Sequence, residues 1–231
     1  MTDHRPTALV LGASRTIGLA VVDQLVQRGW DAIGTVRRAG RTALHDLAES
    51  SAGRVEVETA DLTDRDSLVA LRRRLDGRSL DLVLVNGAIT HGDVPGPDVT
   101  TESFTEVMLT NALGPMVAVG VLADLVVETG TVAVMSSSQG SITLNTNGGY
   151  DLYRASKSAL NQLMRSHVAR HADDSRTFLL LNPGHIQTDL GGPGAPLTIE
   201  EAVPDVVGTL VGVAGRGGLH FLDRFGQTVP W

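Results

Sequence analysis

The sequence predicts an α/β fold, in which one doubly wound parallel sheet of about seven strands carries helices on both faces. Short apolar runs alternate with helical patterns along all 231 residues, which is typical of βαβ units. The run 82–85 is continuously apolar, as expected for a strand buried on both faces. Two glycines, Gly12 and Gly18, bracket the junction between the first strand and the first helix. We therefore expect one domain over residues 1–231, with the strand order 3-2-1-4-5-6-7.

Each strand is expected where a short apolar run of β-like character is bounded by turn residues. Such runs stand at residues 7–11, 31–36, 54–59, 80–86, 130–136, 176–182 and 218–222. Each helix is expected where apolar residues recur with helical spacing between two strands. Those segments are residues 16–28, which Gly29 closes, 41–49, 64–75, 104–127, 151–171 and 200–214.

Composition and charge exclude several classes of protein. Hydrophobic residues make up 42% of the chain and aromatic residues only 3%, so Val, Leu, Ala and Ile must fill one sizeable core. The absence of cysteine leaves no disulfide or thiolate site and fits a reducing cytoplasm. The N-terminus lacks a signal-peptide layout, and no apolar run approaches the ~20 residues of a membrane helix. The net charge of -7 argues against a nucleic-acid partner. Together these features predict a cytoplasmic protein that binds neither membrane nor nucleic acid.

The segment from Gly12 to Gly18 has the features of a phosphate-binding loop. Gly12 permits a tight turn, Gly18 permits close packing of helix on strand, and the helix N-terminus offers free N–H groups to a pyrophosphate. The alternative is an ordinary βα turn that contains glycine. Thr16 stands where dinucleotide loops often have a glycine, so we expect it to crowd the pyrophosphate or tilt the loop. The candidate residues are Gly12, Ser14, Arg15, Thr16, Ile17 and Gly18.

The residues after the second strand indicate which dinucleotide binds. An NAD site would place a carboxylate there, on the ribose hydroxyls, whereas this chain has Thr35-Val36-Arg37-Arg38. Arg37 and Arg38 can form charge-assisted hydrogen bonds with a 2'-phosphate, and Arg15 in the loop could add another. The alternative is that Arg37 and Arg38 lie in a solvated turn. The sequence therefore favours NADP(H) over NAD(H).

The chain contains eighteen arginines and a single lysine, Lys157, which follows Tyr153 by four residues. Residues i and i+4 share a helix face, so the phenol and the ammonium should lie side by side. We expect the ammonium to lower the pKa of the phenol from about 10 and to make Tyr153 a general acid or base. The alternative is a coincidence of spacing.

With these motifs together, the chain resembles the short-chain dehydrogenase/reductase family over nearly its whole length. Further motifs match in chain order: Asp61-Leu62, Asn86-Gly87-Ala88-Ile89 in place of Asn-Asn-Ala-Gly, Asn111, Ser136 to Gly140, and Asn182 to Thr188. The segments Gly148 to Lys157, Thr188 to Pro193 and Phe221 to Trp231 are most similar to C-factor and sniffer-type carbonyl reductases.

The resemblance implies a Rossmann-type dinucleotide-binding oxidoreductase and a role for each matching residue. Tyr153 would exchange a proton with the substrate oxygen, Lys157 would hold the nicotinamide ribose, Ser137 would hydrogen-bond the carbonyl, and Asn111 would hold a relay water. Ser137 is chosen over its neighbouring serines because it has the three-residue spacing to Gly140. The cofactor contacts implied are Asp61, Leu62, Asn86, Gly87, Ala88, Tyr153, Lys157, Pro183, Gly184, Ile186 and Thr188.

We therefore expect an NADP(H)-dependent carbonyl reductase or alcohol dehydrogenase that acts on a small or medium uncharged aldehyde or ketone. The alternative is a dinucleotide-binding signalling or sensor protein with incidental turnover. Loops at 88–99, 139–152 and 189–199 should surround the substrate, with Tyr150, Leu144, Leu190 and Leu197 in the pocket and His185 near the nicotinamide.

Two further expectations concern metals and assembly. His167 and His171 have the i, i+4 spacing of a helical metal site, but no third ligand is evident, so no metal is expected. The helices at 104–127 and 151–171 can each present an outward apolar stripe, which predicts a homodimer or homotetramer of closed symmetry.

Overall fold

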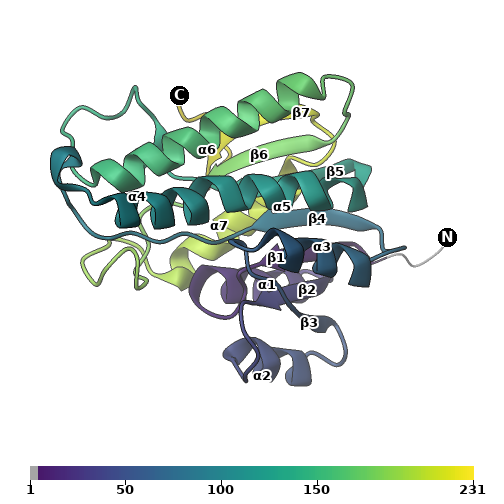
Figure 1. Ribbon diagram of the computed structural model, residues 1–231. Coiled ribbons are helices and arrows are strands. Elements are labelled where there is room, and N and C mark those ends of the chain that lie inside the picture. Colours follow the sequence, from purple (N-terminus) through teal and green to yellow (C-terminus); the bar gives the residue numbers. More distant parts are fainter. Residues whose placement is uncertain (1–4) are drawn as a thin grey trace.

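The computed structural model describes residues 5–231, and its strands form one parallel sheet. The strand order is β3-β2-β1-β4-β5-β6-β7, as the sequence predicts (Figure 1). The strands are β1 (Thr7–Leu11), β2 (Asp31–Val36), β3 (Val55–Thr59), β4 (Leu80–Val85), β5 (Val126–Met135), β6 (Thr177–Asn182) and β7 (Gly218–Asp223). This is the Rossmann-type order, in which the chain reverses direction across the sheet between β1 and β4.

Seven α-helices cover the two faces of the sheet in the described part of the chain. They are α1 (Thr16–Gln27), α2 (Ala43–Ser50), α3 (Arg65–Arg74), α4 (Thr101–Met108), α5 (Gly114–Leu122), α6 (Asp151–Arg170) and α7 (Ile199–Gly212). One apolar cluster joins the sheet to α3, α5 and α6, with Leu71, Val119 and Leu160 fully buried. A second cluster joins the opposite face to α1, α2 and α7. Burial on both faces explains why residues 82–85 of β4 are continuously apolar.

The segment between β4 and β5 departs most from the expected boundaries. The helix expected at 104–127 begins at Thr101, because the Thr100 side chain caps it by accepting a hydrogen bond from the Ser103 N–H at 3.1 Å. A π-helical stretch, Leu109–Leu113, separates α4 from α5, and a short 3₁₀ turn follows at Ala123–Leu125. The chain then enters β5 at Val126, four residues before the expected start at 130, so helix and strand are joined without a loop.

The helical stretch Thr101–Leu125 is long and apolar enough to cross a membrane by length and composition, with a mean hydropathy of 1.5. This corrects the expectation that no such run exists. Half of its most apolar window is buried within the protein, where Ala118 and Leu122 pack against the sheet. Its apolar character is therefore that of a core helix.

Because the strands are parallel, their carboxyl ends meet at one edge of the sheet. The loops that follow β4, β5 and β6 extend from this edge, on the left in Figure 1, opposite the end at which β1 begins. Two short 3₁₀ turns, Gly96–Asp98 and Ser138–Gly140, lie in the first two of these loops.

Candidate active site

A cleft of about 840 Å³ lies at the carboxyl edge of the sheet. The structure places most predicted site residues in its walls: Gly12, Ser14, Arg15, Thr16, Ile17, Arg37, Arg38, Asp61, Leu62, Asn86, Gly87, Ala88, Ser137, Tyr153, Lys157, Pro183, Gly184, Ile186 and Thr188. Two predicted residues, Gly18 and Asn111, are buried and do not line it. Residues from the six loops that follow β1 to β6, together with two from α6, therefore converge on one site, as the doubly wound topology requires.

The phosphate loop is built around two close backbone approaches. Gly12 has φ +79°, and a Cβ atom there would lie 2.1 Å from the carbonyl oxygen of Asn86. A Cβ on Gly18 would lie 2.2 Å from the carbonyl oxygen of Gly12, which also accepts a hydrogen bond from Asn86 Nδ2 at 3.2 Å. Neither glycine can be replaced without moving the loop, and the resulting turn fits the approach of a pyrophosphate to the start of α1.

Thr16, the first residue of α1, keeps the backbone geometry of the glycine that dinucleotide loops often have there. Its φ is +48°, in the left-handed region that costs an L-residue about 1–2 kcal/mol. Threonine in place of glycine at position 16 therefore leaves the turn intact, at the cost of backbone strain at Thr16.

Arg15 is turned toward the far side of the cleft. Its guanidinium pairs with Asp189, in the loop after β6, although the sequence led us to expect it beside a 2'-phosphate. Both side chains are exposed, so the pair is weak and can exchange for another partner.

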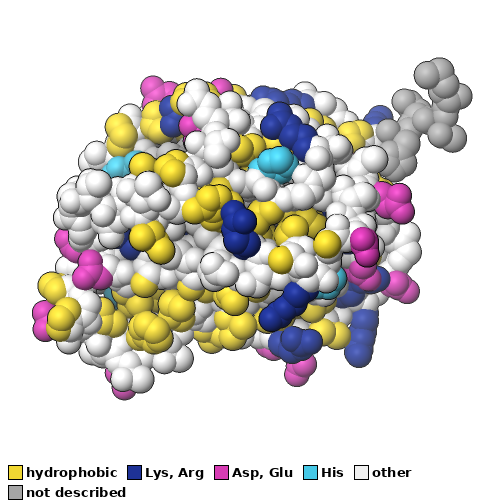
Figure 2. Space-filling view, turned by 90° about the horizontal axis from the view of Figure 1, so that it is seen from above, with side chains coloured by type: hydrophobic (Ala, Val, Ile, Leu, Met, Phe, Trp, Pro, Cys, Tyr) yellow, Lys and Arg dark blue, Asp and Glu magenta, His cyan; other side chains and the backbone are white. Residues whose placement is uncertain are grey.

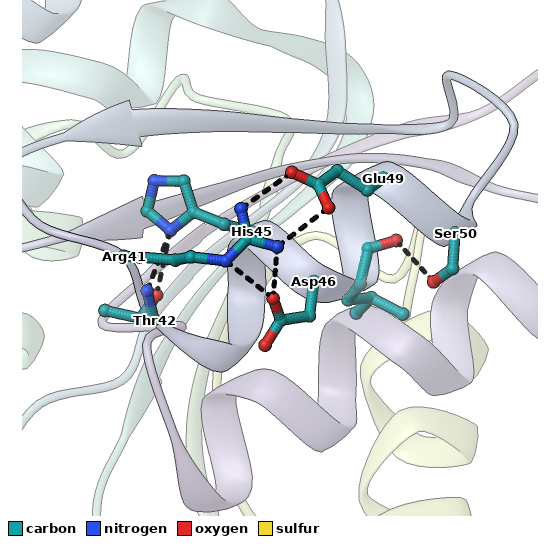
Figure 3. Close-up of polar contacts among 7 residues, drawn as sticks. Arg41, Thr42, His45, Asp46, Glu49 and Ser50 are labelled. Atoms are coloured by element: carbon teal, nitrogen blue, oxygen red, sulfur yellow. Dashed lines mark hydrogen bonds and ion pairs between the residues drawn. The ribbon is translucent and has the colours of Figure 1, made fainter.

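Arg41 is a cleft-lining residue that the sequence did not single out, and its charge is already neutralised. Its guanidinium donates to Asp46 and Glu49, one and two turns into α2 (Figure 3). Hydrogen bonds to Glu49 and then to Asp46 raise the pKa of Arg41 above its ordinary value. The His45 ring caps the same helix by accepting a hydrogen bond from the Thr42 N–H at 3.1 Å.

Arg37 and Arg38 differ from Arg41 in having no such partners. Both line the cleft after β2 and are exposed, and within residues 5–231 neither guanidinium makes a side-chain hydrogen bond or ion pair. The positive charges of Arg37 and Arg38 therefore lie at the end of the cleft beside β2 and β3, without a side-chain partner in the described part of the chain.

Tyr153 and Lys157 lie on α6 beside the end of β5, and both are turned inward. Lys157 is 1% exposed, and its ammonium donates to the carbonyl oxygen of Met135 at 2.9 Å while lying 5.7 Å from the centre of the Tyr153 ring. Burial lowers the pKa of Lys157 to about 8. The helix spacing thus produces the expected pair.

The direction of the Tyr153 shift is opposite to the expected one. Burial raises the pKa of the Tyr153 phenol to about 12, and a hydrogen bond to the Ser137 side chain opposes this. The expectation that Lys157 lowers this pKa is wrong for the protein alone, because the loss of water around the phenolate is the largest effect on it. The phenol is therefore fully protonated at neutral pH.

Two α6 side chains that the sequence analysis did not predict, Ser158 and Asn161, hydrogen-bond the segment that carries Ser137. Asn161 accepts a hydrogen bond from the Ser136 hydroxyl at 2.6 Å and donates to the Gly140 carbonyl at 3.3 Å, and Ser158 donates to the same carbonyl at 3.0 Å. Asn161 is 3% exposed and follows Lys157 by four residues. The helix spacing that links Tyr153 to Lys157 continues to Asn161, and this was the signal available in the sequence.

Asn111 lies behind the cleft, in the π-helical stretch. Its Oδ1 accepts from the Ile89 N–H at 2.8 Å, and its Nδ2 donates to the Ile89 carbonyl and to Ser156 Oγ. The side chain is fully buried and joins the loop after β4 to α6. Its role as holder of a relay water stays a prediction.

The substrate end of the cleft contains part of the expected lining. Tyr150, His185 and Leu190 line it, whereas Leu144 and Leu197 do not. Leu197 packs over Gly184 instead, where its Cδ1 would lie 3.0 Å from an added Cβ, and Leu144 is on the surface. Periodicity cannot determine which face a loop residue presents, and this explains both errors.

A doubly wound sheet with a glycine-built phosphate loop and a Tyr–Lys pair in its cleft defines a dinucleotide-dependent oxidoreductase. Residues 6–195 match the family model described as short chain dehydrogenase. The chain belongs to the short-chain dehydrogenase/reductase family.

Solved structures and a curated relative agree with this assignment. A putative short-chain dehydrogenase/reductase from Burkholderia multivorans with bound NADP is 47% identical, with a TM-score of 0.95 and coverage of 99% of this chain and 100% of that one. A carbonyl reductase from Pseudomonas aeruginosa PAO1 in complex with NADP is 34% identical, with a TM-score of 0.87 and coverage of 99% and 100%. The C-signal protein of Myxococcus xanthus is 33% identical over 136 residues, which are 58% of this chain and 82% of that protein. The expected kinship with C-factor-like carbonyl reductases is confirmed.

Proposed function

We propose that the protein is an NADP(H)-dependent carbonyl reductase that also works in reverse as an alcohol dehydrogenase. Its substrate class is a small or medium uncharged aldehyde or ketone. The observation that carries the proposal is the meeting of Ser137, Tyr153 and Lys157 in one cleft whose opposite end has the uncommitted Arg37 and Arg38.

In this proposal each side chain acts on a defined atom of the substrate or cofactor. When bound in the cleft, the nicotinamide would supply the hydride that reduces the carbonyl carbon. Tyr153 donates its phenolic proton to the oxygen, so the products are the alcohol and the oxidised cofactor. Ser137 hydrogen-bonds the same oxygen as its charge develops. Lys157 holds the nicotinamide ribose, and the fixed position of the Ser137 segment on α6 keeps all three groups together.

The choice of NADP(H) rests on the arginines and on the absence of a carboxylate after β2. A 2'-phosphate can form charge-assisted hydrogen bonds with Arg37 and Arg38, since neither is held by another side chain in the described part of the chain. The two solved relatives that carry NADP support the same choice.

A substrate screen tests the proposal. Aldehydes and ketones of graded size, incubated with the protein and with NADPH or NADH, should consume NADPH, as followed by its absorbance. Binding of NADPH without turnover of any carbonyl compound or alcohol would favour the signalling or sensor alternative instead.

Replacing Lys157 with arginine should lower activity at least about tenfold although the charge is kept. The ammonium lies in a fully buried site, and the larger planar guanidinium must displace its neighbours, at a cost of about 1–3 kcal/mol in stability. Steady-state kinetics and thermal unfolding measure the two effects. Arg170→Lys, an exposed exchange on the same helix, is the matched control. Full activity in Lys157→Arg would show that the compact charge is not required.

We also propose that residues 1–231 form a single domain of a cytoplasmic homodimer or homotetramer. Both apolar clusters share the one sheet, and Phe104, Leu113 and Leu163 are each more than 40% exposed on the helices expected to pair. Figure 2 shows hydrophobic side chains gathered along the lower edge of the view, over the front helices of Figure 1.

Leu113→Glu should convert the oligomer to monomers, because a carboxylate would be buried at the interface without a partner. Light scattering at micromolar concentration measures the mass of each variant. Ile142→Glu, which changes an exposed residue in a loop after β5, is the control. A monomeric wild-type protein would refute this part of the proposal.

A further inference from the structure

Tyr150, the residue before α6, holds a backbone conformation that L-residues rarely adopt. Its φ and ψ are 52° and 41°, in the left-handed region. Gly148 and Gly149 precede it with φ of 67° and 80°, so three consecutive residues are left-handed and only the third carries a side chain. A glycine would meet the backbone requirement of this turn at lower cost.

Contacts from both sides hold Tyr150 in this conformation. Its N–H donates to Asp93 Oδ1 at 2.6 Å, and its carbonyl accepts from the backbone N–H of Arg154 at 2.9 Å. The Arg154 side chain donates to the Gly149 carbonyl at 2.7 Å. The Asp151 carboxylate accepts a second hydrogen bond, from the Gly96 N–H at 2.9 Å. The loop after β4 is therefore bonded to the start of α6 at two points, through Asp93 and through Gly96.

Tyr150 carries a side chain where glycine would be less strained, and the place of its ring in the cleft gives the reason. Tyr150 lines the same cleft as Ser137 and Tyr153, and 43% of it is exposed. It stands at the N-terminal end of a twenty-residue helix, three residues before the proton-donating phenol, and its backbone is held there. Leu190, which is 39% exposed, lines the same cleft and adds apolar surface.

We propose that Tyr150 determines substrate specificity, and that its ring packs against the aryl group of an aromatic aldehyde or ketone. This inference rests on the proposed carbonyl reductase function and narrows its substrate class. The ring would stack offset or edge-on with the aryl group, while Ser137 and Tyr153 engage the carbonyl oxygen. Tyr150 transfers no proton in this account, since the residue four positions after it is an arginine rather than a lysine.

Three substitutions separate the ring from the backbone strain. Tyr150→Phe keeps the ring, Tyr150→Ala keeps the strained Cβ but removes the ring, and Tyr150→Gly removes both. Benzaldehyde and heptanal, which have equal carbon counts, are the probes, with NADPH as reductant. The Ala variant should lower the ratio of kcat/KM for benzaldehyde to that for heptanal by about tenfold, mainly through KM. The Phe variant should keep the wild-type ratio.

The Gly variant separates loss of the ring from damage to the fold, because it is measured both for its substrate preference and for its Tm. It should lose the preference for benzaldehyde as the Ala variant does, while its Tm equals or exceeds that of the Ala variant, because the left-handed strain is relieved. An unchanged ratio in the Ala variant, or an equal loss on both aldehydes, overturns the inference while carbonyl reduction itself stands. A wild-type protein that binds NADPH but reduces no carbonyl compound overturns the proposed function, and this inference with it.

Discussion

Replacing Tyr153 with phenylalanine should lower the turnover of carbonyl reduction by about 10²–10⁴-fold, the usual contribution of general acid–base catalysis. The substitution removes only the phenolic oxygen and its proton. Because burial raises the pKa of this phenol to about 12, the wild-type group is protonated at neutral pH and ready to act as the acid. The affinity for NADPH should stay nearly unchanged, since the ring that packs in the cleft is retained.

Single-turnover kinetics and NADPH titration separate these two effects. Tyr150→Phe is the matched control, because it makes the same chemical change at the other tyrosine and should keep turnover close to that of the wild type. If Tyr153→Phe reduces aldehydes at the wild-type rate, another group supplies the proton.

Replacing Arg37 with aspartate should reverse the cofactor preference. The wild-type protein should prefer NADPH over NADH by about tenfold or more, since each hydrogen bond between charged groups contributes about 1.5–3 kcal/mol. The carboxylate would repel the 2'-phosphate and would accept hydrogen bonds from the free ribose hydroxyls of NADH. Measuring kcat/KM with both cofactors on both proteins gives the size of the reversal.

Arg41 provides the control for this experiment. It lines the same cleft, but Asp46 and Glu49 already engage its guanidinium (Figure 3). Arg41→Ala should therefore leave the preference for NADPH within about twofold of the wild type, well below the loss of a 1.5–3 kcal/mol charged hydrogen bond. A wild-type protein that prefers NADH, or an Arg37→Asp variant with unchanged preference, would show that this end of the cleft does not bind the phosphate.

The strand order and the Tyr–Lys pair could be predicted because both depend on local patterns. Alternation of apolar runs with helical spacing is imposed by backbone geometry, and side chains three or four residues apart lie on one helix face. Element boundaries were less accurate where one element runs into the next, as between α5 and β5. There the 3₁₀ turn at Ala123–Leu125 joins the two elements directly, so no run of loop-forming residues marks the boundary in the sequence.

Several features of the site depend on residues far apart in the chain and could not be predicted. The ion pair between Arg15 and Asp189 joins residues 174 positions apart, a separation at which spacing along the chain predicts no contact. Of Arg37, Arg38 and Arg41, only Arg41 is paired with carboxylates, and this depends on where α2 places Asp46 and Glu49.

The sequence by itself determined the fold, the phosphate loop and the i, i+4 alignment of Tyr153 with Lys157, since each follows from spacing along the backbone. Only the tertiary structure decided the direction of the Tyr153 pKa shift, the partners of the arginines and the left-handed backbone of Tyr150. Burial and ion pairing arise when distant segments exclude water together, and the free energy of a charge depends on that shared environment rather than on its neighbours in sequence.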